Sequence, residues 1–462
     1  MSFLERLANK VTYREVQFEM KDSGVEWIAQ IPKNWQVKRL KNLFSFGKGL
    51  PITKADLVEN GVSVISYGQI HAKSNTGTHL SKELLRFVPE IFLETNPSSL
   101  ISKHDIIFAD TSEDLDGLGN AVLMDIDGKV FAGYHTIILY PIDTRFSKYL
   151  AYLFLTDAWR SQLRASASGI KVFSVTQKML RRCNVILPSP KECDIITSFL
   201  DTQCIKIDSI ISEAKASIEE YKSWKASIIY EVVTKGLDPN VKMKDSGVEW
   251  IGEMPAHWRL IPFKYVLQER NERNTSVISK ERLSLSIDLG VTLYADKTTN
   301  LDRFKEDFSQ YKLAYAGDLV MNSMNMIVGA SGVSSWFGCV SPAYYTFYDT
   351  IEDHVTAKFC EYIFRNKAML RVLHSLGKGI YSIERGDDRI NTCRLKVSKD
   401  DLKKILIPIP PIEEQRKIVG YLKAKCTMLD TLVNEKQALI TDLESYKKSL
   451  IFEVVTGKKR VV

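Results

Sequence analysis

Two long stretches of the chain place apolar residues at alternating steps of four and three, which is the spacing of one helix face in a coiled coil. The first stretch runs from Ile207 to Val232 and the second from Leu429 to Val454, nearly four heptads each. Three lysines interrupt the apolar positions, at Lys225, Lys436 and Lys447. The pattern predicts two long helices, and their matched length favours pairing with each other over membership of two separate bundles.

The regions before each long helix alternate short apolar runs with Gly, Asp and Pro, a pattern that predicts short strands. The strand-like runs are VSVISYGQI, DIIFAD, NAVLMDI and YHTIILYPI in the first region, and LSLSIDLGVTLY, GDLVMNSM and SPAYYTFYD in the second. One helical pattern follows each set, KYLAYLFLTDAWRSQLR in the first and AKFCEYIFRNKAMLRVLHSL in the second. Strands and helices are segregated within each region, which predicts an α+β fold.

The chain also repeats itself in order. The nine residues MKDSGVEWI begin at Met20 and return, letter for letter, at Met243, and the segments that follow, AQIPKNW and GEMPAHW, keep the proline and the final tryptophan. LPSP from Leu187 resembles IPIP from Ile407, and the long helical stretches end on EVVTKG and EVVTGK. The offset between the copies is 220 at the prolines and 222 at the endings, so we expect two inserted residues between them. The repeat indicates a tandem duplication.

We therefore expect an α+β fold in which a β-rich domain and a long helix are duplicated in tandem, with the two long helices paired as an antiparallel coiled coil. The two variable regions show no sequence similarity to each other, so one architecture is expected to carry two different recognition surfaces. The predicted boundaries are 1–35 for the N-terminal segment with the first motif, 36–186 for the first variable domain, 187–236 for the first long helix, 237–258 for a linker with the second motif, 259–406 for the second variable domain, and 407–462 for the second long helix and C-terminal tail.

Composition and charge narrow the class of protein. No apolar run reaches the ~18 residues that span a bilayer, and the N-terminal MSFLERLANK lacks the apolar core of a secretory signal, so we expect a cytoplasmic chain. The seven cysteines form no CxxC pair, which favours free thiols over a zinc or redox site. The net charge is +7, and the long helices carry −2, from 13 basic and 15 acidic residues, so the rest carries +9. Any positive surface for an anionic partner is expected mainly outside the helices.

Motifs for catalysis and cofactor binding are missing from the sequence. It contains no GxxxxGK[ST] loop, no HExxH, no GxGxxG after a strand, and neither the Gly-rich loop nor the Asn-Pro-Pro-aromatic tetrapeptide of a methyltransferase. Glu113, Asp114 and Asp116 could be proposed as a metal site, but such an acidic run is more often a solvated loop. The sequence predicts no cofactor and no metal, which favours recognition or scaffolding over catalysis.

Four features recur in a known order: VEWIAQIPKNW and VEWIGEMPAHW, a P-x-P entry into each long helix, PIEEQRKIVGYL in the second half, and EVVT at both helix ends. With them the chain resembles, over essentially its whole length, the specificity subunits of type I restriction-modification systems. One departure is visible, because the first long helix begins PKECDIITSFL, where the Glu-Gln pair usual in the family is missing. Any partner contact made by that pair is in doubt in the first half.

The resemblance implies a non-catalytic subunit whose variable domains are target-recognition domains, each reading one half of an asymmetric, bipartite site on double-stranded DNA. It implies two methylation subunits as partners, with restriction subunits in the full complex, and places the adenosylmethionine, ATP and Mg²⁺ sites on those partners. The helices would set the spacer between half-sites. Their length agrees, since the 25 steps from Ile207 to Val232 span ~38 Å at ~1.5 Å per residue, and one DNA turn is ~34–36 Å.

Candidates for contact with DNA are polar side chains near strand ends, because base edges are read by amide, hydroxyl, imidazole, Arg and Lys groups. The candidates are Lys48, Tyr67, Gln69, His71, Lys73, Asn75, Lys171, Asn322, Asn325, Ser331, Ser334, Trp336, Lys378, Tyr381, Arg385 and Arg389. The alternative is a polar surface turn or, in MNSMNMIVGASGVSSWF, a buried Gly/Ser turn that supports the sheet. His135 is interpreted as a core histidine. A coiled-coil scaffold without a DNA role, and an independent nuclease or methyltransferase, are the competing functions.

Overall fold

The structure is a computed structural model that describes residues 19–167, 172–296, 307–351, 353–380 and 394–461 of the 462-residue chain. Contacts along the chain divide it into two units, one of residues 1–213 with 439–462 and one of residues 214–438. Each unit holds one variable domain, the beginning of one long helix and the end of the other.

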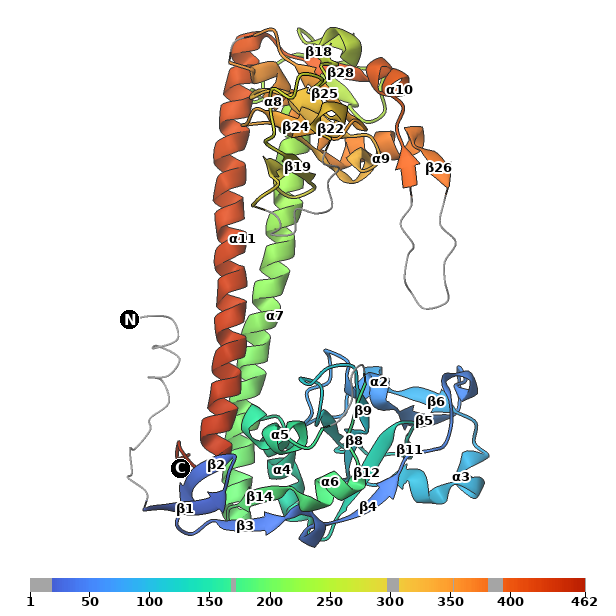
Figure 1. Cartoon of the computed structure of the whole chain (residues 1–462), viewed down its shortest axis with the longest axis vertical. Coiled ribbons are helices and arrows are strands. Elements are labelled where there is room, and N and C mark those ends of the chain that lie inside the picture. Colours follow the sequence, from blue (N-terminus) through green and yellow to red (C-terminus); the bar gives the residue numbers. More distant parts are fainter. Residues whose placement is uncertain (1–18, 168–171, 297–306, 352, 381–393, 462) are drawn as a thin grey trace. The chain divides into compact units, whose positions relative to one another are not determined.

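Two four-stranded sheets form the first variable domain (Figure 1). One has the strand order β10-β8-β12-β4, with antiparallel neighbours, and the other has the order β6-β5-β11-β7. Their bounds are β4 Phe44–Lys48, β5 Val62–Ile65, β6 Arg86–Val88, β7 Leu100–Ile101, β8 Ile106–Ala109, β10 Ala121–Leu123, β11 Val130–Ala132 and β12 Thr136–Pro141. A single core cluster contains buried side chains of both sheets, among them Ile65, Ile107 and Ile138.

The second variable domain repeats the first of these sheets in a different sequence. Its strand order is β23-β22-β25-β18, so each strand takes the place of β10, β8, β12 or β4 in the same antiparallel pattern. The bounds are β18 Gln268–Arg270, β22 Leu319–Asn322, β23 Ser331–Val333 and β25 Tyr344–Tyr348, and the further pairs are β19 Leu283–Ser286 with β20 Gly290–Leu293 and β21 Lys312–Ala314 with β24 Gly338–Val340. The α+β prediction is confirmed, and the two domains share a sheet that their sequences do not reveal.

Two short helices follow the sheet strands in each domain, so the prediction of a single helix is wrong. They are α4 (Ser147–Phe154) and α5 (Asp157–Arg164) in the first domain, and α8 (Val355–Phe364) and α9 (Lys367–Leu376) in the second. The helical conformation is interrupted at Thr156 and at Asn366. Their side chains accept hydrogen bonds from the backbone N–H of Trp159 and of Ala368, respectively. A side chain that caps backbone donors starts a new helix, even where apolar periodicity continues.

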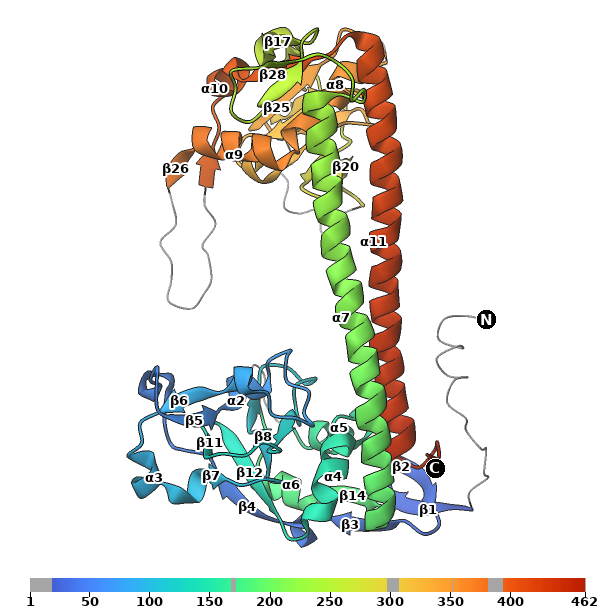
Figure 2. The ribbon, with the colours of Figure 1, turned by 180° about the vertical axis from the view of Figure 1, so that it is seen from behind.

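The predicted long helices are α7 (Pro190–Lys235) and α11 (Ile412–Val455) (Figures 1 and 2). In the second unit, Ile228 and Val232 of α7 share one buried cluster with Leu422 and Leu429 of α11. The helices are antiparallel there, because Lys225 binds Asp430, whereas Gly236, just past the end of α7, lies beside Glu414 near the start of α11. The coiled-coil prediction is confirmed.

Two of the three lysines that interrupt the seam are paired across it. Lys225 lies 2.7 Å from a carboxylate oxygen of Asp430 in the second unit, and Lys447 lies 2.7 Å from one of Asp208 in the first. The two ion pairs occupy equivalent positions of the repeat, since both Lys225 and Lys447, and both Asp208 and Asp430, differ by 222. A polar pair within an apolar seam favours one register of the two helices over others.

The repeated nine residues fold into the same hairpin in each half. β1 (Met20–Val25) pairs with β2 (Ile28–Pro32), and β15 (Met243–Asp245) pairs with β16 (Glu253–Pro255), with the methionine opposite the proline in both. A tryptophan follows each hairpin and reaches the first turn of the next long helix. Trp35 Nε1 lies 3.5 Å from Glu192 of α7, and Trp258 Nε1 donates to Glu414 of α11 at 3.0 Å.

The same tryptophans also contact the end of the other long helix. A Cβ added at Gly236 would meet Trp258 at 3.2 Å, and one added at Gly457 would meet Trp35 at 3.2 Å. Both glycines have positive φ, as the residues that end helices often do. Each motif therefore joins the start of one long helix to the end of the other, which is why the chain carries it twice.

The offset of 220 at the prolines, and the two-residue insertion inferred from it, are wrong. The strands that enter the long helices, β14 (Asn184–Leu187) and β28 (Leu406–Ile409), are offset by 222, as are the starts of α7 and α11. Glu192 therefore stands in the place of Glu414, so the glutamate of the family's pair is retained in the first half. Only the glutamine is replaced, by Cys193, and both side chains are buried.

Candidate nucleic-acid interface

Two of the predicted DNA-contacting residues, Tyr67 and His71, border a cavity of about 730 Å³ in the first domain. Tyr67 begins the short helix α2 (Tyr67–Ile70), and His71 follows its end. The opposite wall is residues 110–120, the connection between β8 and β10, together with His135. The sequence therefore located one side of a concave surface, and the structure adds the other.

Several candidates of the first domain are bound within it. The imidazole Nε2 of His71 lies 2.7 Å from the carbonyl oxygen of Thr111, and its Nδ1 lies 3.0 Å from the amide nitrogen of Asn120. Gln69 accepts from the backbone N–H of Ser66, and the Asn75 amide donates to two backbone carbonyls. Among the described candidates here, these internal bonds leave Tyr67, Lys48 and Lys73 the freest to contact a ligand.

Lys48 and Lys73 are exposed, as a phosphate-binding role requires. Lys48 ends β4 and borders a second, open cavity of about 760 Å³ beside Tyr140. Lys171 lies outside the described residues, and its contact with DNA stays a prediction.

In the second domain, burial separates the candidates of the Asn- and Ser-rich segment. Asn322, Ser331 and Ser334 are buried, so their side chains belong to the buried Gly/Ser turn given above as the alternative. Asn325 is exposed and Trp336 is half-buried. The connection between β22 and β23, which contains Asn325, occupies the same place in the sheet as the acidic connection 110–120 of the first domain.

Lys378 lies in β26 (Lys378–Ile380), and its side chain is 78% exposed. Its ammonium group is 3.2 Å from the carboxylate of Asp401, which is a weak surface pair that DNA phosphate could replace. Tyr381, Arg385 and Arg389 lie outside the described residues, so their roles stay predictions.

The interpretation of His135 as a core residue is wrong. Its side chain is 55% exposed, and its backbone has a φ of 56°, a left-handed conformation that directs the side chain away from the sheet interior. Its Nδ1 lies 3.1 Å from a carboxylate oxygen of Asp110, and its ring packs edge-on against Tyr67 and Tyr134. The sequence suggested a buried histidine because apolar residues of β12, which are themselves buried, follow His135 closely.

The acidic residues of the first domain border the same cavity. Glu113, Asp114 and Asp116 line it, and Asp114 accepts a hydrogen bond from the backbone N–H of Gly117 at 2.6 Å. Within the described ranges, no three His, Cys, Asp or Glu side chains are grouped closely enough to hold a metal ion.

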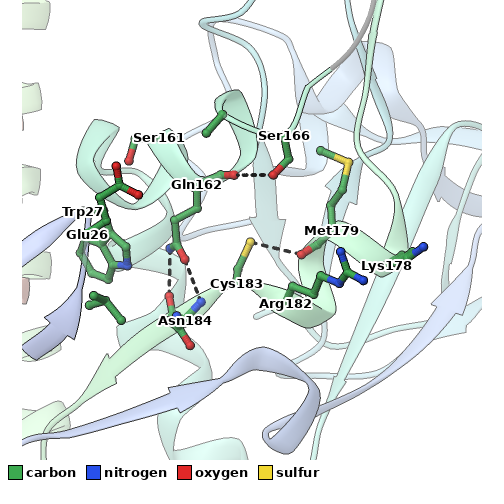
Figure 3. Close-up of a pocket in the computed structure, with 12 residues that line it drawn as sticks. Glu26, Trp27, Ser161, Gln162, Ser166, Lys178, Met179, Arg182, Cys183 and Asn184 are labelled. Atoms are coloured by element: carbon green, nitrogen blue, oxygen red, sulfur yellow. Dashed lines mark hydrogen bonds between the residues drawn. The ribbon is translucent and has the colours of Figure 1, made fainter.

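A third cavity, of about 800 Å³, lies beside the repeated motif in the first unit (Figure 3). It is bordered by Trp27, by Gln162 of α5, and by Lys178 and Arg182 of α6 (Gln177–Arg182). Gln162 is held by Asn184, whose backbone N–H donates to its side-chain oxygen at 2.8 Å. Lys178 and Arg182 are exposed there, and so is Glu26, so the lining of this cavity carries charges of both signs.

One pair of buried carboxylates differs between the domains. Asp105 and Asp318 each lie directly before the equivalent strands β8 and β22, and each accepts a hydrogen bond from the backbone N–H three residues earlier. Asp318 also binds Arg270, with distances of 2.6 and 3.1 Å. The strand pairing puts Gly47 where Arg270 stands, so Asp105 lacks that partner, and burial raises its pKa to about 6.

No helix of the described residues is long and apolar enough to cross a membrane. The six cysteines among them are free thiols, and five of these are buried.

Comparison with known proteins agrees with these features. The family described as "Type I restriction modification DNA specificity domain" matches residues 32–220 and 389–442, just over half of the chain. The EcoKI specificity subunit of Escherichia coli K12 is 20% identical over 93% of this chain and 90% of its own, and the StySPI specificity subunit of Salmonella potsdam is 21% identical over 88% and 82%. A solved structure concerned with complex assembly and conformational transition of the type I R-M system shares the fold, with 17% identity, a TM-score of 0.63, and coverage of 92% of this chain and 99% of that one. The chain belongs to the family of type I restriction modification DNA specificity domains.

Proposed function

We propose that this chain is the DNA-recognition subunit of a type I restriction-modification complex and that its two variable domains each read one half of a bipartite, asymmetric site. The observation that carries the proposal is the shared sheet order of two domains whose equivalent loops differ in chemistry. The connection between β8 and β10 is acidic, whereas the one between β22 and β23, residues 323–330, is uncharged. Equal scaffolds with unequal loops would read two different sequences.

Two further parts of the proposal follow from the family. The chain itself is non-catalytic, and two methylation subunits, joined by restriction subunits, supply the adenosylmethionine, ATP and Mg²⁺ sites. The chain works in the cytoplasm, where its DNA lies. The absence of nucleotide and methyltransferase motifs in the sequence supports this division of labour.

The long helices would set the spacing between the two half-sites. Support comes from their unbroken length, from the buried cluster that joins α7 and α11 in the second unit, and from the equivalent ion pairs of Lys225 and Lys447. A scaffold without a DNA role would also need such helices, but it would not need two domains with divergent loops.

The test is to express the chain with a methylation subunit in cells that lack other such systems and to sequence the methylated bases of the genome. We expect one asymmetric motif with two defined parts and a fixed gap. The purified chain should bind that DNA with a steep dependence on salt, and should not methylate it alone. Methylation by the isolated chain, or a DNA affinity indifferent to sequence, would refute the proposal.

A further inference from the structure

His135 is held in an unusual state for a histidine on the surface of a sheet domain. Its φ of 56° is a conformation that non-glycine residues rarely adopt and that costs about 1 kcal/mol or more, so the surrounding structure must enforce it. The backbone carbonyl of His135 accepts from the N–H of Asp110 at 3.0 Å, and the imidazole packs against Tyr67 and Tyr134, with ring centroids 5.3 and 6.1 Å away. The ring is thereby fixed at the rim of the cavity of about 730 Å³.

The partner of its first nitrogen determines what the second can do. An ionised carboxylate has no proton to donate, so Asp110 accepts the Nδ1–H of His135 at 3.1 Å. In the neutral ring Nε2 is then the acceptor, and it makes no hydrogen bond within the described residues. An oriented, exposed and unused acceptor at the rim of a cavity is suited to receive an N–H group from a ligand.

The rest of the cavity selects the kind of DNA group that can enter. The carboxylates of Glu113, Asp114 and Asp116 border it, so a phosphate would be repelled. A base edge that presents an amino group would be attracted. In the major groove only adenine, through N6, and cytosine, through N4, present such a donor.

We propose that His135 contacts a base directly and that the cavity it borders accepts the amino edge of an adenine or a cytosine in one half-site. The inference rests on the proposed function, since it names residues by which the first domain would read DNA. Tyr67 supplies the aromatic wall, and Asp110 acts as a positioning residue that fixes the tautomer of the imidazole.

The second domain lacks this arrangement. The sheet pairing puts Ala343 in the place of His135, and the equivalent connection between β22 and β23 carries no charged residue. Any effect of changing His135 is therefore confined to one half-site, and the other half-site serves as an internal control.

The experiment uses the full chain with its methylation partner and DNA that contains the motif identified by methylome sequencing. Each adenine is replaced in turn by purine, which lacks the N6 amino group, and each cytosine by 2-pyrimidinone, which lacks the N4 amino group. Dissociation constants are measured for the wild type, for His135→Gly and for His79→Ala. Glycine adopts positive φ without strain, so His135→Gly should fold at least as well as the wild type, which thermal unfolding checks.

His79 is the matched control, because it is 59% exposed and pairs through Nδ1 with Asp125 at 2.7 Å in the same domain, away from the cavity. We expect the wild type and His79→Ala to lose about tenfold in affinity at one position of one half-site when its amino group is removed, the size of a typical base contact. His135→Gly should bind unmodified DNA about tenfold more weakly and lose nothing further at that position.

Equal responses of the wild type and His135→Gly at every position would overturn the inference while leaving the proposed function intact. The inference would also be overturned if His135→Gly removed the response to amino-group removal at a position in each of the two half-sites. If the wild type fails to distinguish its motif from random DNA, the proposed function fails and the inference falls with it.

Discussion

Replacing Asp105 by asparagine should raise stability by more than the same replacement of Asp318. The two carboxylates are equivalent in the fold, and are 4% and 2% exposed, but only Asp318 has a cation beside it. Asparagine keeps the side-chain oxygen that accepts from the backbone N–H of Ser102 or of Tyr315, and removes the charge. The pair of substitutions therefore isolates the effect of burying a carboxylate with and without Arg270.

For Asp105 the magnitude follows from its pKa, which burial raises from the ordinary 3.8 to about 6. The folded state holds the proton more tightly than the unfolded state, so this group contributes stability fully below about pH 4 and loses it as the pH rises to about 6. A shift of about two units corresponds to about 3 kcal/mol at ~1.4 kcal/mol per unit. Asp105→Asn should therefore stabilise the first domain by up to about 3 kcal/mol at pH 7, and by less than about 1 kcal/mol at pH 4.

For Asp318 burial also raises the pKa, but the Arg270 guanidinium opposes that rise. Asp318→Asn would leave the charge of Arg270 facing a neutral amide. Asparagine can still accept a hydrogen bond from Arg270, which is 23% exposed and stays stacked on Tyr315 and Tyr348. Loss of the ion pair therefore offsets part of the stability gained by removing the buried charge. The second domain should therefore gain less at pH 7 than the first domain gains from Asp105→Asn.

The assay is urea unfolding of the full chain between pH 4 and pH 8, with hydrogen exchange of β8 and β22 to assign each change to its domain. Loss of stability in Asp105→Asn at pH 7, or an unchanged slope of stability against pH between 4 and 6, would refute the argument that Asp105 is buried without a compensating charge. Equal effects of the two substitutions would refute the role assigned to Arg270.

Three further predictions concern the long helices and the DNA surface. Inserting one heptad after Ala216 and another after Ala438 preserves the apolar seam and lengthens both helices by ~10 Å, or about three base pairs of DNA. Methylome sequencing should then return the same half-sites with a longer gap between them. Unchanged spacing in an active variant would contradict the spacer role. Lys225→Glu should destabilise the helix pair by about 1 kcal/mol in urea unfolding, and adding Asp430→Lys should restore it, whereas no recovery would mean that the ion pair does not set register. Lys378→Ala should weaken DNA binding about equally for all sequences and lower the salt slope by about 1, and equal affinities at two salt concentrations would count against a phosphate contact.

An element of the fold is predictable from the sequence when many residues contribute to the same pattern, and it is not when a single side chain determines it. The long helices are predictable because a heptad repeat continues for nearly four periods, and every period adds to the evidence. The breaks at Thr156 and Asn366 are not, because each depends on one side chain that caps a helix while apolar spacing continues across it. The common sheet of the two domains is hidden for a related reason, since core positions accept many apolar residues and strand order leaves no mark on a single sequence.

The candidate site is less predictable than the fold because exposure at a turn depends on backbone conformation. Asn322 and Ser331 have the residue types of a reader, but their strands turn them inward. His135 sits among apolar residues, but a positive φ turns it outward. A signal was available for Tyr67 and His71, where polar residues gather after a strand, and both do border the cavity.

The residues that the two halves share explain why the family can be recognised from sequence while the target cannot. The shared residues, such as Trp35 with Glu192 and Trp258 with Glu414, form the junctions where the two long helices meet, and these contacts tolerate little change because each joins three segments. The connections that follow β8 and β22 lie outside these junctions, and they differ in charge and length. Under the proposed function, a new DNA sequence would be read through changes in the variable domains, whose sequences in one half predict nothing about those in the other.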